Sequence, residues 1–203
     1  ITIARMEAGD EYRYSGSATV MNAGWGDSSG IIRSPIDGRF YTIVHNRFAE
    51  GLQGNGSCVI RTHDISDPKA WRGWGGQSFS VAFTSPYEDT SPPYEPAKHI
   101  CKPLDLPECV VMGVSWSTYL ERFVSSLSCG ATNGGDGFGG KVGRVKSAYF
   151  STSLDMVAWS DPQVLFTPAA ATDIQFFSYP KLIDPDAASR GDRNFETIGQ
   201  TAT

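Results

Sequence analysis

The sequence predicts an all-β protein, and three features of its 203 residues support that class. First, 22 glycines and 12 prolines break the chain into short stretches, as expected of a fold with many turns. Second, the stretches between them are rich in β-branched and aromatic residues. Third, an aspartate-led turn that ends in Trp occurs twice, as DPKAW at 67–71 and as DMVAW at 155–159. A repeated turn after a strand-like run indicates a repeated structural unit.

Ten segments have the composition of strands, with turn residues between them. In chain order they are 30–35, 40–48, 57–63, 78–83, 109–116, 119–128, 144–153, 162–166, 176–184 and 194–203. The spacing of Leu120, Phe123, Val124 and Leu127 would also suit a short helix, but aromatic and β-branched neighbours favour a strand. Residues 84–107 are rich in Pro, Ser and acidic residues and are expected to form a long loop.

The order of these segments predicts a β-propeller of four-stranded antiparallel blades. A blade takes about 40–50 residues, and the segments account for only some of the blades that a closed propeller needs. We expect residues 30–83 and 108–166 each to form one antiparallel sheet, with Trp71 and Trp159 in equivalent places. Residues 1–203 would then form a single propeller domain, incomplete in this chain, which a further chain or segment completes.

Composition argues against several kinds of partner. The net charge of −5 and the lack of a basic patch argue against nucleic acid. No apolar run approaches the ~20 residues of a membrane-spanning helix, so no membrane partner is expected. The three histidines, His45, His63 and His99, lack metal-ligand spacing, so no metal site is predicted. No cofactor is expected either, although a structural calcium ion is left open.

The four cysteines, Cys58, Cys101, Cys109 and Cys129, contain no CxxC pair, which argues against a zinc site. Cys101 and Cys109 flank a Pro-containing loop, and a disulfide between them is sterically plausible. Such a bridge would imply an oxidising compartment, so the predicted location is extracellular or periplasmic. The alternative is four buried, reduced thiols.

The segment STSLDMVAWSDPQVLF at 151–166 resembles a blade signature of the five-bladed β-propeller glycoside hydrolases, the arabinanase, xylosidase and invertase-like clans. HDISDPKAWRGW at 63–74 resembles the same element in an earlier blade, and SPIDGRFYTIVHN at 34–46 is similar to a strand pair of these enzymes. The resemblance implies five blades in the full protein. It also implies hydrolysis of a glycosidic bond in an oligosaccharide or polysaccharide by a pair of carboxylates in the central funnel.

Family members place acidic residues on the innermost strands of their first blades. By this resemblance Asp27 in WGDSSG and Asp184 in LIDPD are candidate catalytic carboxylates. Glu108 in PEC resembles the proton donor of the invertase-like branch. The alternative for Asp27 and Asp184 is that each caps a local turn.

Three further residues are candidates for substrate binding. Trp25 and Trp116 could be platforms on which a sugar ring stacks, although Trp116 stands in an apolar run that also suits core packing. Arg33 in IIRSP resembles an arginine of sialidases, which makes a sialidase-like activity a third option. The main alternative to a glycosidase is a propeller that binds carbohydrate, or serves as a scaffold, without catalysis.

Overall fold

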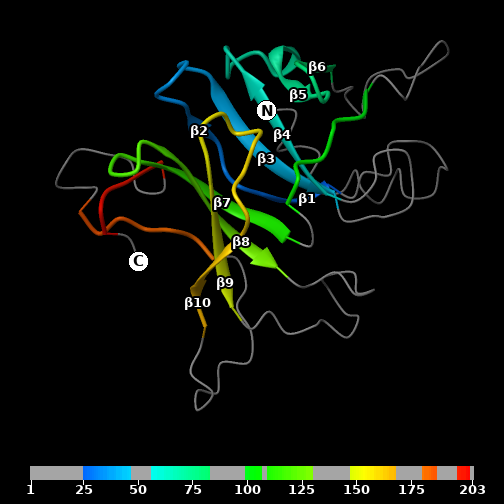
Figure 1. Cartoon of the computed structure of the whole chain (residues 1–203). Coiled ribbons are helices and arrows are strands. Elements are labelled where there is room, and N and C mark those ends of the chain that lie inside the picture. Colours follow the sequence, from blue (N-terminus) through cyan, green and yellow to red (C-terminus); the bar gives the residue numbers. More distant parts are fainter. Residues whose placement is uncertain are drawn as a thin grey trace, which may run out of the picture.

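The protein is all-β, and two sheets, built mostly of antiparallel strand pairs, contain all the strands of the described residues (Figure 1). A 3-10 turn at Pro68–Ala70 lies between β4 and β5. The computed structural model describes residues 25–46, 56–82, 99–106, 109–129, 147–167, 180–186 and 196–201.

The first sheet, blue to cyan in Figure 1, has the strand order β1-β3-β4-β5-β6, and β2 pairs with β3 beside β1. Every strand pair in it is antiparallel. The sheet is therefore a meander of consecutive strands, as predicted for residues 30–83. The bounds are β1 Trp25–Ser28, β2 Ile32–Arg33, β3 Phe40–Asn46, β4 Gly56–Thr62, β5 Arg72–Trp74 and β6 Phe79–Ala82.

The second sheet has the order β10-β9-β8-β7-β11; in Figure 1 the strands β7 to β10 run from green to orange-yellow and β11 lies in the red part of the chain. Four of its strands form a second antiparallel meander, as predicted for residues 108–166: β7 Cys109–Ser117, β8 Arg122–Cys129, β9 Ala148–Ser153 and β10 Gln163–Phe166. The segment with helical spacing is thus a strand, β8. The short β11, Thr197–Ile198, runs parallel to β7 along its free edge. The described end of the segment expected as a strand at 176–184 has no regular structure.

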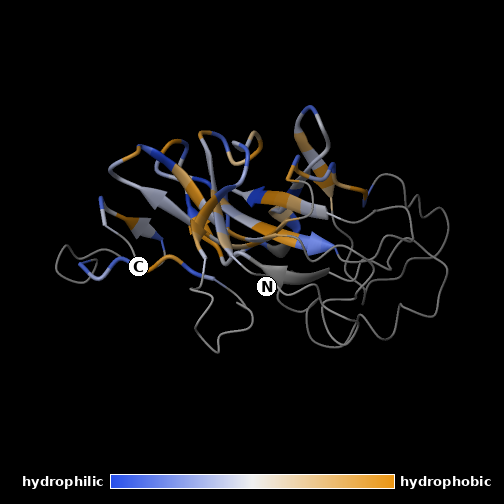
Figure 2. Cartoon of the chain, turned by 60° about the horizontal axis from the view of Figure 1, so that its bottom comes forward, coloured by the Kyte–Doolittle hydropathy of each residue, from blue (hydrophilic) through white to orange (hydrophobic). Residues whose placement is uncertain are grey.

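The main hydrophobic core lies between the two sheets, because side chains from one face of each sheet meet there. This central cluster joins Tyr41, Ile43 and Val59 of the first sheet to Phe123 and Leu127 of the second. Figure 2 shows apolar stretches of the strands gathered in the middle of the molecule. The central cluster also contains Leu104 and Leu106, so the end of the expected loop at 84–107 is part of the core.

Each sheet has a smaller cluster on its other face. The Trp71 cluster contains Val44, Cys58, Ile60, Trp71 and Cys101 and covers the outer face of the first sheet. The Leu182 cluster contains Val124, Leu182 and Ile198 and covers the outer face of the second sheet. Both sheets are therefore covered by apolar side chains on two faces, as in a stack of sheets.

The two aspartate-led turns follow the same strand of their meanders. Thr62 ends β4 and Ser153 ends β9, and the hydroxyl of each accepts a hydrogen bond from the backbone N–H of an Asp two residues later. These residues are Asp64 and Asp155, and each carboxylate then accepts N–H groups of its own turn. The counterpart of Asp155 is thus Asp64 and not Asp67, which the matching of DPKAW with DMVAW had aligned with it; Asp67 caps the 3-10 turn by accepting the N–H of Lys69. The Ser/Thr-x-Asp turn is therefore one local structure used twice, with Trp71 and Trp159 following it.

The two tryptophans lie on corresponding faces of their sheets. Aligning Thr62 with Ser153 matches Cys58 with Tyr149 and Val59 with Phe150. Cys58 lies in the Trp71 cluster, and Tyr149 packs against the central cluster, as Trp159 does. Val59 and Phe150 lie on the opposite faces, in the central and the Leu182 clusters. The second sheet thus repeats the first in the same orientation. Trp159 is on the face of the second sheet that meets the first sheet, and Trp71 is on the outer face of the first sheet.

The cysteines form two disulfides, Cys58–Cys101 and Cys109–Cys129. The predicted Cys101–Cys109 bridge is wrong. Cys109 stands directly opposite Cys129 in the β7–β8 ladder, so the register of that hairpin selects its partner. Cys101 instead lies in the Trp71 cluster beside Cys58. Two bridges are consistent with an oxidising compartment.

Peptide mapping of the protein without reduction should recover two linked fragments, one joining Cys58 to Cys101 and one joining Cys109 to Cys129. Removing the second bridge with a Cys109→Ser/Cys129→Ser double variant should lower the free energy of unfolding by about 2–4 kcal/mol. A fragment that links Cys101 to Cys109, or four titratable thiols in the unfolded, unreduced protein, would contradict the pairing.

Candidate functional site

The connections of both sheets define two ends. Hairpin turns 34–39, 63–71, 118–121 and 154–162 lie at one end, called here the hairpin end. Because neighbouring strands alternate in direction, β1 and β7 both begin at the other end, called here the open end. The N–H of Leu104 donates to the carbonyl of Ser57 at the start of β4, which brings the chain entering β7 to that same end.

Asp27 lies at the open end in a β-bulge of the edge strand β1. Trp25 pairs with Asn46 and Ser28 pairs with Val44, so Gly26 and Asp27 together stand opposite the single residue His45. Bulges are common at sheet edges and beside active sites, where the extra residue redirects a side chain. The bulge in β1 therefore contains Asp27, one of the candidate catalytic carboxylates.

Next to this bulge, a buried polar pair, His45 and Ser57, lies on the two neighbouring strands of the sheet. The Nδ1 atom of His45 on β3 lies 3.0 Å from Oγ of Ser57 on β4. Their exposed fractions are 6% and 2%. Because His45 and Ser57 are register partners, the bulge, the imidazole and the hydroxyl lie on three adjacent strands, β1, β3 and β4.

Asp184 lies elsewhere and already has partners. Its carboxylate accepts the backbone N–H of Asp186 at 2.8 Å and that of Gly199 at 2.6 Å, and the residue is 1% exposed. Gly199 follows β11, which pairs with the final residues of β7, so Asp184 is near the hairpin end. These bonds tie the chain before Asp186 to β11. The structure does not group Asp184 with Asp27, and its catalytic role stays a prediction.

The other candidates are spread over the molecule. Glu108 lies outside the described residues, and in the sequence it directly precedes Cys109, the first residue of β7. The backbone of Trp25 is in β1, and its side chain is outside the described part. Trp116 is half-buried, packs against the central cluster and meets Phe123 edge-on, with ring centroids 5.0 Å apart. Its platform role stays a prediction.

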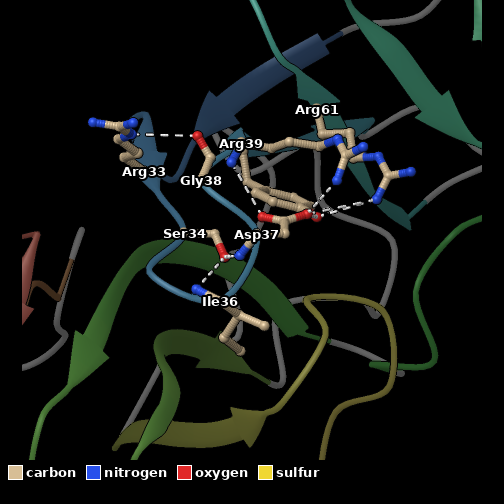
Figure 3. A network of polar contacts seen from close by, with 8 residues as sticks. Arg33, Ser34, Ile36, Asp37, Gly38, Arg39 and Arg61 are labelled. Atoms are coloured by element: carbon tan, nitrogen blue, oxygen red, sulfur yellow. Dashed lines mark hydrogen bonds and ion pairs between the residues drawn. The ribbon is translucent and has the colours of Figure 1, made fainter.

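Arg33 is exposed at the hairpin end, next to a polar network (Figure 3). Its Nε donates to the carbonyl of Gly38 at 3.3 Å, and its guanidinium lies over the Phe40 ring. The network itself is centred on Asp37, whose carboxylate accepts bonds from Tyr41 at 2.8 Å and Arg39 at 3.1 Å. The sialidase-like role of Arg33 stays a prediction.

Burial and the hydrogen bonds of this network together shift two pKa values. Partial burial raises the pKa of the Asp37 carboxyl, but bonds from Tyr41, Arg39 and Ser34 together outweigh it, so the pKa lies below its usual value of 3.8. Burial and the neighbouring Asp37 raise the pKa of Tyr41, against the effect of Arg61. Tyr41 therefore stays protonated at neutral pH and donates to an ionised Asp37.

Asp37→Asn should lower the free energy of unfolding by about 1 kcal/mol at pH 7, because a charge-assisted bond becomes a neutral one. The folded-state pKa of Asp37 is depressed, so its stabilisation is present above the unfolded-state pKa and is lost as the pH falls through the folded-state value. Urea titrations at several pH values should thus show the difference disappearing below about pH 4. Asp105→Asn, at an exposed position, is the control. A difference that does not shrink as the pH falls below about 4 would contradict the account.

Sequence reasoning missed His45, Ser57 and the Asp37–Tyr41 network. His45 directly follows the apolar run FYTIV, where a polar side chain is expected to be buried. That position was a signal from which a buried polar site could have been predicted. Its pairing with Ser57 depends on strand register, which the sequence alone did not provide.

Comparison with known proteins gives no match: no family model fits the chain, and no curated protein or solved structure matches it. Within the described ranges, no three His, Cys, Asp or Glu side chains group closely enough to hold a metal ion. The described part also contains no helix that is long and apolar enough to cross a membrane.

Proposed function

We propose that this protein is a β-propeller glycoside hydrolase that acts on an oligosaccharide or polysaccharide. The observation that carries the proposal is the repetition of an antiparallel meander, with its Ser/Thr-x-Asp turn and its Trp on corresponding faces. Successive blades of a propeller stack in the same sense, so this arrangement supports the proposal. The complete propeller would have five blades, and the further blades would come from a further segment or chain.

The proposed catalytic pair is Asp27 with Glu108. Asp27 lies in the edge strand β1, and Glu108 precedes β7 in the sequence, so both belong to the beginnings of strands at the open end. β1 and β7 pack against each other. Glycoside hydrolysis needs one protonated carboxyl to donate to the leaving oxygen and one carboxylate to act as base or nucleophile. We assign the donor role to Glu108 and the second role to Asp27.

A panel of polysaccharides and aryl glycosides tests this activity. The protein should release reducing ends or aryl alcohol from at least one of them, at a rate proportional to its concentration. If no member of the panel is hydrolysed while one is bound, the protein is a carbohydrate-binding propeller. The engagement of the Asp184 carboxylate by two backbone amides favours that second candidate, because it commits one of the three expected carboxylates to structure.

The proposed location is extracellular or periplasmic. Its support is the pair of disulfides, which persist in oxidising compartments and are rare in reducing ones. Hydrolysis of a polymer outside the cell is consistent with that location.

A further inference from the structure

The Asp37 network at the hairpin end contains more positive than negative charge (Figure 3). The Nη1 atoms of Arg39 and Arg61 lie 3.1 Å and 3.9 Å from the same carboxylate oxygen of Asp37. Among the described residues, Asp37 is the only carboxylate that pairs with either guanidinium. One negative charge therefore faces two positive charges, and a second anion beside the two guanidinium groups would be attracted there.

Arg61 is held in place by three contacts. Its guanidinium lies over the Phe79 ring, 4.0 Å from the ring centroid, and its Nη1 donates to the hydroxyl of Tyr41 at 3.2 Å. The third contact is the ion pair with Asp37. A guanidinium fixed in this way loses little further conformational freedom when it binds an anion.

Both arginines keep N–H groups for a further partner. Within the described ranges, the Nε and Nη2 atoms of Arg39 and Arg61 have no hydrogen-bond partner, because their contacts with Asp37 and Tyr41 use Nη1. The two side chains remain 45% and 31% exposed, so a ligand can reach them. The Nε and Nη2 atoms of an arginine form a planar fork that matches two oxygens of a carboxylate or a sulfate.

Arg72 adds to the positive charge on this part of the sheet. It is the register partner of Arg61 across β4 and β5, and like charges directly opposite each other destabilise a sheet. Its Nη1 donates to the backbone carbonyls of Lys69 and Trp71 at 2.6 Å and 2.8 Å, but these neutral acceptors do not cancel its charge. An anion beside Arg61 would offset this repulsion.

We propose that Arg39 and Arg61 form a binding site for an anionic group of a polysaccharide, a carboxylate or a sulfate, which accepts hydrogen bonds from their Nε and Nη2 atoms. The inference rests on the proposed glycoside hydrolase function for the polymeric nature of the ligand. The seven residues of β3, Phe40–Asn46, separate this site from the open end by roughly 20–25 Å. Only an extended polymer can occupy both, so the substrate class is an acidic polysaccharide.

The first test measures binding of dextran sulfate, polygalacturonate and neutral dextran by calorimetry. The wild type should bind at least one of the two anionic polymers at least about tenfold more tightly than dextran, and the polymer that it prefers identifies sulfate or carboxylate as the anion. An Arg39→Gln/Arg61→Gln double variant should bind that polymer about tenfold or more weakly, because it loses charge-assisted hydrogen bonds. An Arg122→Gln/Lys102→Gln double variant loses the same charge elsewhere and should stay within about threefold of the wild type.

The second test uses Asp37→Asn, for which the expected effect has the opposite sign. The variant removes the negative charge that repels the ligand, so it should bind the same polymer roughly threefold or more tightly at pH 7. A purely structural role of the network would not produce tighter binding. Binding should be measured well below the unfolding midpoint of each variant.

Three results would overturn the site: anionic polymers that bind no better than dextran, equal losses in the two double variants, or Asp37→Asn that does not tighten binding. Hydrolysis is scored separately. If an anionic polymer binds through Arg39 and Arg61 but no polysaccharide is cleaved, the site stands and the proposed hydrolase fails. If neutral glycans are cleaved and anionic polymers do not bind, the hydrolase stands and the site fails.

Discussion

Asp27→Asn should lower the hydrolysis of an aryl glycoside by about 100-fold or more, the usual scale for losing acid–base or nucleophilic help. Asparagine keeps the shape of the side chain but cannot accept a proton or attack the sugar. The register supports the choice of residue, because Asp27 lies in a bulge of an edge strand at the open end. Substrate binding should survive, so the loss should appear in kcat.

Asp184→Asn is the matched control for that experiment. Its carboxylate accepts hydrogen bonds from the backbone amides of Asp186 and Gly199. The substitution should therefore lower the free energy of unfolding, while the hydrolysis rate of the folded protein should change little. Kinetics of both variants should be measured well below their unfolding midpoints. If Asp27→Asn stays within twofold of the wild type, Asp27 is not catalytic, and a large loss in Asp184→Asn alone would return the catalytic role to Asp184.

Trp71→Ala should lower the free energy of unfolding by about 3–5 kcal/mol, the usual cost of emptying a large aromatic site. Trp71 is 2% exposed in a cluster that includes the Cys58–Cys101 bridge. Trp159 is only half-buried, so Trp159→Ala should cost less, although it occupies the corresponding face of its sheet. Urea unfolding followed by circular dichroism measures both.

Trp71→Phe is the control for size and polarity. The indole N–H of Trp71 is buried without a hydrogen-bond partner among the described residues, so phenylalanine removes that donor while it keeps an aromatic ring. Its cost should fall well below that of alanine. A loss below 1 kcal/mol for Trp71→Ala would show that this Trp does not hold the first sheet together.

The strands could be predicted from the sequence because each depends on local composition, and β8 shows this well. Its helical spacing was outweighed by Phe123 and Val124 and their neighbours, and it is a strand. The repeated turns were equally local, since Ser153 and Asp155 bond within their own loop.

Features that depend on register could not be predicted in the same way. Cys109 is eight residues from Cys101 in sequence, but the β7–β8 ladder places it opposite Cys129. The His45–Ser57 pair likewise exists only because β3 and β4 align those two positions. For Asp184 the sequence offered both a turn-capping and a catalytic role, and only the fold revealed the amide of Gly199, fifteen residues away.

The most direct test of the proposed activity is a crystal structure of the protein with a bound oligosaccharide, in which the distance between the carboxyl groups of Asp27 and Glu108 is measured. The account predicts a separation of about 5–9.5 Å, with the glycosidic oxygen between the two groups at the open end. A sugar held there by aromatic side chains alone, with the two carboxyl groups more than about 15 Å apart, would contradict it, because neither group could then assist the other across one bond.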